Sequence, residues 1–465
     1  MKISILIPAY NERYTICEII RKVSKAQLPD GFEREMIVVD DYSIDGTFDL
    51  LKNLLKEIPE IKLFRQNKNM GKGAAIKKAI EMATGDIAII QDADLEYDPN
   101  EYIRLLEPIV EGYADVVYGS RFASTTLKRV LFFRHALGNR FLTFLSNIFT
   151  DLNLSDMETC YKAFRMELLK SIPIRSKRFG FEPEITAKIA KRGFRVYEVP
   201  ISYYGRTYEE GKKITWKDGI EALYTIFKYW IIDDIYTDAD SRILNALSGT
   251  RRFNSWMVRQ IDFYVGNEVL EIGSGIGNLT QHFLPKDRYV CSDIDPLHLH
   301  RLSNRFYRRP NIEIKKLDIS EKIEVHKIND QYDTVICINV LEHIENHKLA
   351  LMNINKLLKQ GGRLILLVPN SPYLFTTLDE ALGHHRRYKK NEIKSLLLDT
   401  GFELEKIWYF NRISVLGWIW NGKILKRRYF SRFQLKIFDS LIWFWKRIDP
   451  YFPWPGQSII AIAKK

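Results

Sequence analysis

Three acidic residues follow a short apolar run near residue 90. Asp92 and Asp94 stand two positions apart directly after Ile87–Ile90, and Glu96 comes two positions later. Carboxylate oxygens are the ligands that Mg²⁺ and Mn²⁺ prefer, and these ions keep positions open for phosphate oxygens. Such an ion stabilises the charge that a diphosphate acquires when its bond to a sugar breaks. Because an isolated Asp-x-Asp is more often a solvated turn, a metal site at these acids is predicted only together with further polar residues nearby.

Two other polar segments follow predicted strands and would meet the acids at one edge of a parallel sheet. They contribute Pro8, Tyr10 and Glu12 after the first strand and Asp40, Asp41 and Asp45 after the second. Paired acids at this place commonly hold the base or ribose of a nucleotide, whereas Asp45 is also suited to cap the next helix. Lys72, between two glycines at a predicted helix start, is placed to meet phosphate, and a flexible turn is the alternative. With Asp92, these residues predict a site for a nucleotide sugar.

A second set of residues, in the other half of the chain, predicts a different nucleotide. Three alternate glycines follow the apolar run Val269–Ile272 and let the backbone approach a ligand closely. The spacing is not that of a dinucleotide site, because residue 278 is Asn. Acids after the next two predicted strands suit ribose hydroxyls and an adenine edge. The set predicts an adenosyl group without phosphate, bound by Gly273, Gly275, Gly277, Asp293 and Asp318.

Several histidines follow in the same half. His343 and His347 stand four positions apart, a spacing that suits a metal within one helix, but the sequence favours a surface position for His347. The run Gly383–Tyr388 holds two more histidines among polar and aromatic residues and predicts the entrance for a second substrate. Either of them is suited to deprotonate a hydroxyl, and His384 is taken as the candidate base.

Both sets of residues depend on alternating strands and helices. Apolar runs predict strands in residues 1–120, residues at helical spacing predict the helices between them, and the same alternation restarts at Arg251. This rhythm predicts two mostly parallel sheets with helices on both faces. Phe179–Glu184 is predicted to be an ordered loop. The predicted organisation is a first domain at 1–236, a linker at 237–250 and a second domain at 251–465.

Composition limits where the protein works. The four cysteines are scattered without metal-binding spacing, which favours a reduced, cytoplasmic chain. The first residues already predict a strand, so no signal peptide is expected, and no uncharged apolar run approaches the ~20 residues of a membrane span. Residues 412–455, an insertion before the last strand, hold nine Lys or Arg, two Asp and five Trp. This composition favours contact with a membrane surface, with a lid over the second site as the alternative, and no nucleic-acid motif is present.

The first half resembles the inverting glycosyltransferases of family 2, which have the GT-A fold, and within them the dolichyl-phosphate mannosyltransferase group. The resemblance implies that Asp40 and Asp41 face the nucleoside and that Asp92, Asp94 and Glu96 surround the metal, although these enzymes often have Gln in place of Glu96. It also implies roles near the phosphates for Arg121, Arg206 and Lys213. The segments that carry it are Pro8–Glu12, Asp40–Thr47, Gly71–Gly73, Asp92–Glu96, Gly119–Phe122 and Asp156–Arg165.

The same resemblance implies a polyprenyl phosphate as the acceptor, at the cytosolic face of a membrane. A phosphate monoester is already anionic near neutral pH, so its attack on a sugar needs cations and an apolar groove but no strong base. Arg129, Arg134 and Arg140, among Phe and Leu residues, are suited to line such a groove, and an ordinary amphipathic helix is the alternative. If the acceptor is a glycan hydroxyl, a base is required, and Asp156 and Glu158 are the candidates.

The second half resembles the class I S-adenosylmethionine-dependent methyltransferases over residues 250–411 and 457–465. The resemblance is carried by Glu271–Gly277, Asn339–His343 and Leu358–Gly362. It implies a Rossmann-like fold that binds S-adenosyl-L-methionine with Glu271, the glycine turn, Asp293 and Asp318, and it places Asn339 beside them.

The sequence thus predicts an α/β protein with a GT-A-like nucleotide-sugar domain followed by a Rossmann-like class I methyltransferase domain. We expect a bifunctional enzyme that transfers a hexose from a GDP- or UDP-sugar to a polyprenyl phosphate or lipid-linked glycan, and a methyl group to a sugar or related acceptor. We expect it in the cytoplasm, peripheral on the cytosolic face of the membrane. The alternatives are a glycosyltransferase that acts on a sugar hydroxyl, and a second domain that only binds S-adenosylmethionine or docks on the membrane.

Overall fold

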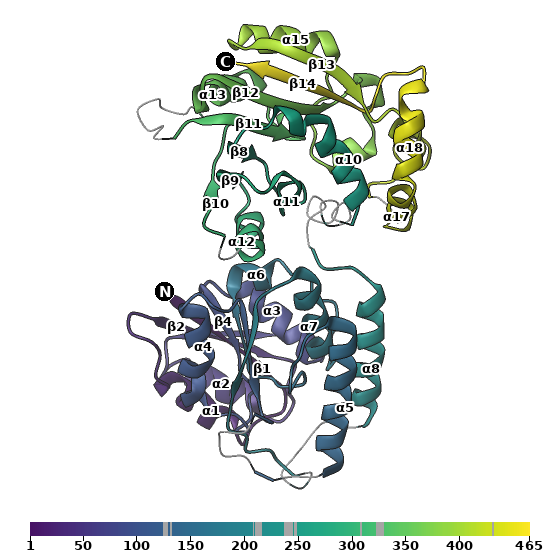
Figure 1. Ribbon diagram of the computed structural model, residues 1–465. Helices are drawn as coiled ribbons and strands as arrows, with labels where there is room; N and C mark the ends of the chain where they lie inside the picture. The colour runs from purple at the N-terminus through teal and green to yellow at the C-terminus, as the bar shows by residue number, and fades with distance from the viewer. Residues whose placement is uncertain are drawn as a thin grey trace. The chain divides into compact units, whose positions relative to one another are not determined.

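The computed structural model describes residues 1–123, 129–130, 133–207, 209, 216–236, 245, 249–306, 309–321, 330–429 and 432–465. The chain forms two compact units, Met1–Thr237 and Asp238–Lys465 (Figure 1). Each unit has its own apolar core. The division falls at the start of the predicted linker, most of which lies outside the described residues.

The first unit is built on a seven-stranded sheet in the order β3-β2-β1-β4-β6-β5-β7. Strand β6 is antiparallel to both of its neighbours, and the other pairings are parallel. Because β2, β1 and β4 are adjacent and parallel, their carboxyl ends share one edge of the sheet. The strands are β1 (Lys2–Ala9), β2 (Glu33–Asp40), β3 (Ile61–Arg65), β4 (Ile87–Ile90), β5 (Val116–Ser120), β6 (Lys162–Arg165) and β7 (Val196–Pro200).

Helices cover this sheet because their apolar residues recur at helical spacing. In α1, for example, Ile16, Ile19, Ile20 and Val23 are fully buried. The prediction of a loop at Phe179–Glu184 is wrong, because Phe181 begins α7 and is buried with Ile185. The helices are α1 (Ile16–Lys25), α2 (Thr47–Leu54), α3 (Lys72–Met82), α4 (Tyr102–Val110), α5 (Phe133–Thr150), α6 (Met166–Lys170), α7 (Phe181–Arg192) and α8 (Trp216–Ile231), with a 3₁₀ turn η1 (Pro99–Glu101).

The second unit also has a seven-stranded sheet, in the order β10-β9-β8-β11-β12-β14-β13. Strand β14 is antiparallel to β12 and β13, and the other pairings are parallel. The carboxyl ends of β8, β9 and β11 therefore share one edge. The strands are β8 (Glu268–Ile272), β9 (Arg288–Asp293), β10 (Ile312–Lys316), β11 (Tyr332–Ile338), β12 (Leu358–Pro369), β13 (Glu403–Phe410) and β14 (Ser458–Lys464).

The helices of the second unit lie between these strands and in the insertion before β14. Within the described ranges, every helix is too short or too polar to cross a membrane. The helices between strands are α10 (Arg251–Ile261), α11 (Thr280–Phe283), α12 (Pro296–Arg305), α13 (His347–Leu357), α14 (Thr377–Ala381) and α15 (Lys390–Asp399), with 3₁₀ turns η2 (Asp262–Tyr264), η4 (Leu341–His343) and η5 (Pro372–Leu374). The insertion forms α16 (Ser414–Trp418), the π-helix η6 (Ile419–Ile424), α17 (Arg432–Ser440), α18 (Ile442–Ile448) and η7 (Asp449–Tyr451).

Candidate functional site

In the first unit, Arg206 is surrounded by three carboxylates. Its guanidinium lies 2.7 Å from Asp94, 3.3 Å from Glu12 and 3.4 Å from Glu96. The Arg206 amide donates to one oxygen of Glu96, and the Tyr203 hydroxyl donates to the other. Burial, reinforced by Asp92 and Glu96, raises the pKa of Asp94 to about 8. Segments far apart in the chain thus gather acids around one cation; these four side chains are called the acidic cluster below.

A second cation, Lys72, faces the other acid of the predicted pair. Its ammonium lies 2.9 Å from Asp92 and 3.1 Å from Glu182. Burial alone would lower the pKa of Lys72, but Asp92 and Glu182 outweigh it and hold the pKa well above its usual range. The Oε2 atom of Glu182 is buried and has no hydrogen-bond partner in the part of the chain that the structure describes. Sequence reasoning missed Glu182, because only the packing of α7 brings it to Lys72.

The residues at this edge fit a hard divalent cation. Five carboxylates, those of Glu12, Asp92, Asp94, Glu96 and Glu182, form ion pairs with the two cations Lys72 and Arg206. Carboxylate oxygens in excess of the local positive charge are what Mg²⁺ and Mn²⁺ bind in proteins.

The predicted nucleoside residues differ in what their carboxylates do. Asp40 is buried, pairs through Oδ2 with Arg65 at 3.2 Å, and has an Oδ1 atom without a hydrogen-bond partner among the described residues. Both oxygens of Asp41 instead accept backbone amides, from Met70 and Gly71, and fix the turn before α3. An open hollow beside Asp40 is lined by Tyr42, Ser43, Ile44, Gly46, Phe48, Asp49 and Arg65.

The other members of the two strand-end segments have structural contacts. Asp45 accepts the amide and the hydroxyl of Thr47, the first residue of α2, although Gly46 and not Asp45 is the N-cap residue of that helix. Pro8 is buried at the end of β1, whereas Tyr10 is exposed. Lys213 lies outside the described residues.

Arg121 and Asp156 form a bidentate ion pair. Nε and Nη2 of Arg121 lie 2.6 and 2.7 Å from the two oxygens of Asp156, which is fully buried. Glu198 accepts the backbone amides of Ser155 and Asp156 and thereby fixes the loop that carries the acid. The guanidinium of Arg121 also lies over the Tyr203 ring, 5.1 Å from its centroid. A carboxylate held this tightly is poorly suited to act as a base, so the pair favours Asp156 as the residue that positions Arg121.

Glu158 has the opposite environment. Its Oε1 atom is buried without a hydrogen-bond partner among the described residues. Burial, and next to it the charge of Glu182, raises the pKa of Glu158 to about 8. A carboxyl group in this state is suited to exchange a proton near neutral pH.

Helices α5 and α8 pack side by side in the first unit (Figure 1). Phe149 of α5 contacts Phe227 and Trp230 of α8, with ring centroids 5.2 and 4.8 Å apart. Each helix also carries an exposed apolar stripe at helical spacing. The stripes comprise Phe133, Leu137, Phe141, Phe144 and Ile148 on α5 and Trp216, Ile220, Tyr224, Phe227 and Ile231 on α8.

The arginines predicted to line an acceptor groove lie before and on α5. Arg129 donates to the Gly205 carbonyl at 3.1 Å, and Arg140 lies over the Phe122 ring, 5.7 Å from its centroid. Arg134 is exposed in the first turn of α5.

In the second unit, the glycine turn follows β8 and is held by buried contacts. A Cβ atom on Gly273 would lie 2.3 Å from Val340, so the turn packs directly on the segment after β11. Glu271 is buried and accepts the hydroxyls of Thr280 and Tyr289 at 2.6 and 2.9 Å. Burial raises the pKa of Glu271 to about 7. These contacts show Glu271 anchoring the turn. Gly277 packs against Leu302 and Phe306, and all three glycines of the turn have positive φ.

Asp293 lies beside the glycine turn at the end of β9. One of its oxygens accepts the Gly275 amide at 2.8 Å, and the other accepts the Asp295 amide at 3.0 Å. Asp318 is exposed after β10, and Asn339 is exposed after β11 with a positive φ of 54°. The predicted cofactor residues therefore share the carboxyl edge of β8, β9, β10 and β11.

In the structure, His343 lies next to His384 and not next to His347, the histidine four positions away in the sequence. Nδ1 of His384 lies 2.9 Å from Asp379, an acid that the sequence analysis did not select. The ring of His384 stands 4.8 Å from the ring of His343, centroid to centroid. His347 lies elsewhere, with its Nδ1 next to the Tyr388 hydroxyl and Arg386.

The insertion at 412–455 has an exposed apolar and basic surface. Trp420, Ile424, Tyr429 and Trp443 are exposed, and exposed lysines such as Lys423 and Lys426 lie between them. Trp418 instead points inward and donates to the Leu374 carbonyl.

Two family models match the chain, one in each half. The first, described as glycosyl transferase family 2, matches residues 4–172, and the second, described as a methyltransferase domain, matches residues 270–364. With the two mixed sheets, these matches confirm the predicted fold class, a GT-A-like unit followed by a Rossmann-like methyltransferase unit.

Three named proteins are similar to part of the chain. The dolichol-phosphate mannosyltransferase of Pyrococcus furiosus is 28% identical over 46% of this chain and 59% of its own length. Glycosyltransferase AglJ of Haloferax volcanii is 30% identical over 44% of this chain and 63% of its own length. The undecaprenyl-phosphate mannosyltransferase of Micrococcus luteus is 30% identical over 46% of this chain and 87% of its own length. The chain thus spans about three fifths of the first two relatives and most of the third. It belongs to glycosyl transferase family 2 through its first unit and carries a methyltransferase domain in its second half.

Proposed function

We propose that the first unit transfers a hexose, with inversion, from a nucleotide sugar to a polyprenyl phosphate. The observation that carries this proposal is the acidic cluster, in which Glu12, Asp94 and Glu96 surround Arg206 at the carboxyl edge of the sheet. The names of two relatives, a dolichol-phosphate and an undecaprenyl-phosphate mannosyltransferase, support a lipid phosphate as the acceptor and a hexose as the transferred group.

The donor would lie along the carboxyl ends of β1, β2 and β4. Asp92, Asp94 and Glu96 would hold Mg²⁺ or Mn²⁺, which when bound supplies positive charge to the departing diphosphate.

Asp40, whose Oδ1 atom is buried without a partner among the described residues, would accept a hydrogen bond from the base or ribose of the donor. Asp41 and Asp45 would shape the walls of the site through their backbone contacts. Lys72, Arg206 and Lys213 would face the phosphates.

In the proposed reaction, an oxygen of the lipid phosphate attacks the anomeric carbon of the hexose. The bond between that carbon and the diphosphate oxygen breaks, and the nucleoside diphosphate leaves. The attacking phosphate is already anionic, so no proton has to be removed. Arg121, held in one orientation by Asp156, would place its positive charge beside the reacting phosphates.

The lipid chain of such an acceptor requires an apolar surface. In the first unit, the exposed stripes on α5 and α8 offer one, and in the second unit the insertion at 412–455 exposes apolar and basic side chains of its own. Aromatic and aliphatic side chains with neighbouring lysines and arginines suit the headgroup region of an anionic membrane. We propose that the protein works as a peripheral enzyme on the cytosolic face.

A sugar hydroxyl is the second candidate acceptor, and Glu158 favours it. Attack by a hydroxyl needs a base, and the pKa of Glu158, raised to about 8 by burial, suits that task better than the tightly paired Asp156.

For the second unit, we propose transfer of a methyl group from S-adenosyl-L-methionine to a sugar or lipid-linked glycan. The glycine turn, Asp293, Asp318 and Asn339 would bind the methyl donor, and Glu271 would anchor the turn. His384, oriented by Asp379, would prepare the acceptor hydroxyl. The alternative is a unit that binds S-adenosylmethionine without turnover.

The first proposal is tested by offering the purified chain a polyprenyl phosphate, Mg²⁺ or Mn²⁺, and a panel of GDP- and UDP-hexoses. Mass spectrometry of the lipid fraction is expected to show a hexosyl-phosphoryl lipid with one donor. Asp94→Asn should lower its formation by at least about 100-fold, whereas Asp30→Asn, an exposed residue, should not change it. Release of the nucleotide only when a glycan acceptor is present, and its loss in Glu158→Gln, would instead establish transfer to a sugar hydroxyl.

The second proposal is tested with S-adenosylmethionine that carries a labelled methyl group. Incorporation of label into a lipid-linked glycan, lost in Asp293→Ala, is expected. Binding of S-adenosylmethionine with no labelled product from any glycan would favour the binding module.

A further inference from the structure

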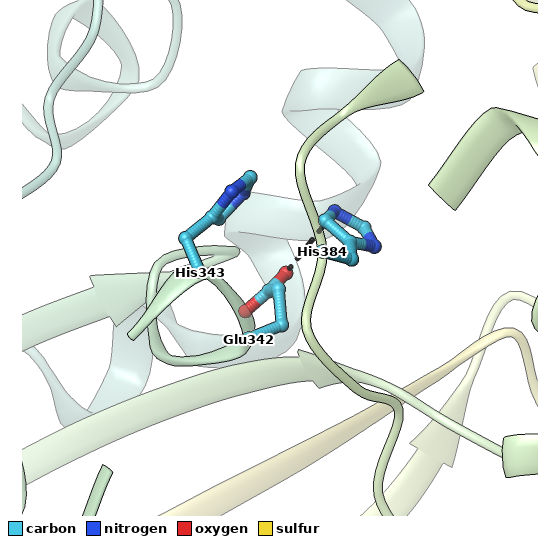
Figure 2. A group of neighbouring side chains, drawn as sticks. All are labelled: Glu342, His343 and His384. Carbon is cyan, nitrogen blue, oxygen red and sulfur yellow. Dashed lines mark ion pairs between the residues drawn. The ribbon is translucent and has the colours of Figure 1, made fainter. Parts of the chain in front are cut away.

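Three side chains of the second unit converge outside the predicted cofactor turn. Glu342 and His343 lie in η4, directly after β11, and His384 comes from the loop that follows α14 (Figure 2). One ligand atom from each residue lies within 4.8 Å of the other two. The His384 Nε2 atom is 3.9 Å from the Glu342 Oε1 atom.

The carboxylate of Glu342 has no other task in the described residues. The side chain is fully buried, and neither carboxylate oxygen has a hydrogen-bond partner there. A buried carboxylate without a partner is destabilising, so such a group is expected where a cation or a ligand satisfies it. The backbone carbonyl of Glu342 accepts the His385 amide at 2.9 Å and ties the two segments together.

The imidazole of His384 is oriented to offer a lone pair to this point. Nδ1 of His384 faces the Asp379 carboxylate, which can only accept, so this nitrogen carries the proton and Nε2 is left as an acceptor towards Glu342. A carboxylate behind a histidine is the usual outer contact of a metal-binding imidazole. Asp379 is itself fixed by Arg387 at 2.7 Å and by the Thr376 amide at 2.8 Å. His343 is exposed and can adjust its rotamer.

We propose that Glu342, His343 and His384 form a binding site for a divalent transition-metal ion such as Zn²⁺, Co²⁺ or Fe²⁺. Two imidazole nitrogens and one carboxylate oxygen favour this class of ion over Mg²⁺ or Ca²⁺. With bonds near 2.0 Å, tetrahedral ligands stand about 3.3 Å apart, so ligand atoms up to 4.8 Å apart need to approach one another by about 1.5 Å at most. Three protein ligands leave one position open for an acceptor oxygen.

The site lies beside the predicted methyl-donor turn, because Val340, two residues before Glu342, packs against Gly273. If the proposed methyl transfer holds, an acceptor hydroxyl bound to the ion would have a lowered pKa and would release its proton to solvent. The resulting oxygen would attack the methyl carbon, the bond from that carbon to sulfur would break, and S-adenosylhomocysteine would leave. In that case His384 acts as a ligand and does not take the proton itself.

Metal binding is tested on the full chain, in an Asp94→Asn background that removes the main acid of the first unit. Protein stripped with a chelator is titrated with Co²⁺ in the presence of excess Mg²⁺, and the visible absorption of bound Co²⁺ is followed. One equivalent is expected to bind and to be displaced by Zn²⁺. Glu342→Gln, His343→Gln and His384→Gln should each weaken binding by at least about tenfold. His385→Gln, the same change at the adjacent exposed residue, should bind as the parent does.

The outcomes separate the metal site from the methyl transfer. Absence of Co²⁺ binding in the parent, or equal affinity in the three ligand variants and His385→Gln, would overturn the site, whatever the methylation assay shows. Binding without methylation would leave the site standing and overturn only its proposed role. Thermal melts identify variants that fail to fold, and His343→Gln keeps the test decisive because that side chain is exposed.

Discussion

At the scale of single residues, Arg206 occupies the place where a metal ion and a diphosphate would also be attracted. Its contacts with Glu12, Asp94 and Glu96 neutralise acids that a divalent ion would bind. If the proposed function holds, Arg206 and the ion would compete for the same oxygens before the donor arrives, and they would cooperate once a diphosphate is present.

Replacing Arg206 is expected to separate these two effects. Arg206→Gln should bind Mn²⁺ several-fold more tightly in the absence of nucleotide, because the carboxylates lose a competing cation. The same variant should have a KM for the nucleotide sugar that is higher by roughly tenfold, because one charged hydrogen bond to phosphate is lost. Calorimetry and initial rates measure the two quantities, with Arg104→Gln as a control on an arginine that bonds Glu101 and the Pro200 carbonyl. Weaker Mn²⁺ binding in Arg206→Gln would contradict the competition.

Glu271 makes the stability of the second unit depend on pH. Burial raises its folded pKa from 4.5 to about 7, so the folded state favours the protonated form. Protonated Glu271 contributes about 3 kcal/mol to the free energy of unfolding. This contribution is fully present below about pH 4.5 and is lost as the pH rises through 7. Relative to wild type, Glu271→Gln should thus gain about 3 kcal/mol of unfolding free energy between about pH 4.5 and pH 8.

Denaturant unfolding of the second unit at the two pH values measures this gain. Glu268→Gln is the matched control, since Glu268 is partly exposed and pairs with Lys359 at 2.8 Å. A pH-independent difference between Glu271→Gln and wild type would show that Glu271 keeps an ordinary pKa.

At the scale of elements, the pair α5 and α8 is unusual in exposing apolar stripes while packing through Phe149. Isolated exposed apolar residues are common on proteins, but a continuous stripe marks a surface that binds something. If the acceptor is a lipid phosphate, as proposed, the membrane that holds the lipid is what these stripes are expected to bind.

Charge placed on the α8 stripe is expected to release the protein from lipid. Ile220→Glu combined with Tyr224→Glu should reduce co-sedimentation with anionic vesicles by at least about fivefold, because two apolar contacts are replaced by repelled charges. The fold should be kept, since both side chains are exposed. Val110→Glu, at an exposed residue that ends α4, is the control. Unchanged sedimentation of the double variant would remove α8 from the membrane contact.

At the scale of the whole molecule, the two units have separate cores and separate sets of site residues. Separate cores favour separate unfolding transitions. We expect two transitions in calorimetry, one raised by S-adenosylmethionine alone and the other by nucleotide sugar with Mn²⁺ alone. At ligand concentrations near 100 times Kd, each should be stabilised by about 2.7 kcal/mol. A single transition that responds to both ligands would show that the units unfold together.

The sequence by itself determined the features that depend on local order. The acids after β1, β2 and β4 and the glycine turn after β8 each belong to one strand and the turn that follows it. Strand and helix periodicity place such residues at a sheet edge without knowledge of the rest of the chain. The matches of residues 4–172 and 270–364 to the two family models agree with that analysis.

Only the tertiary structure decided which distant residues join them. Arg206 is 112 positions from Asp94, and the contact of Lys72 with Glu182 depends on the packing of α7. The structure also separates His343 from His347, a pair that the sequence did not favour as a metal site. Residues four positions apart face the same way only within one helix, but His343 ends η4 and His347 begins α13. His384 meets His343 instead, from a loop whose path no local pattern specifies. Contacts between segments depend on how elements pack, and packing is set by the whole core rather than by any one stretch of sequence.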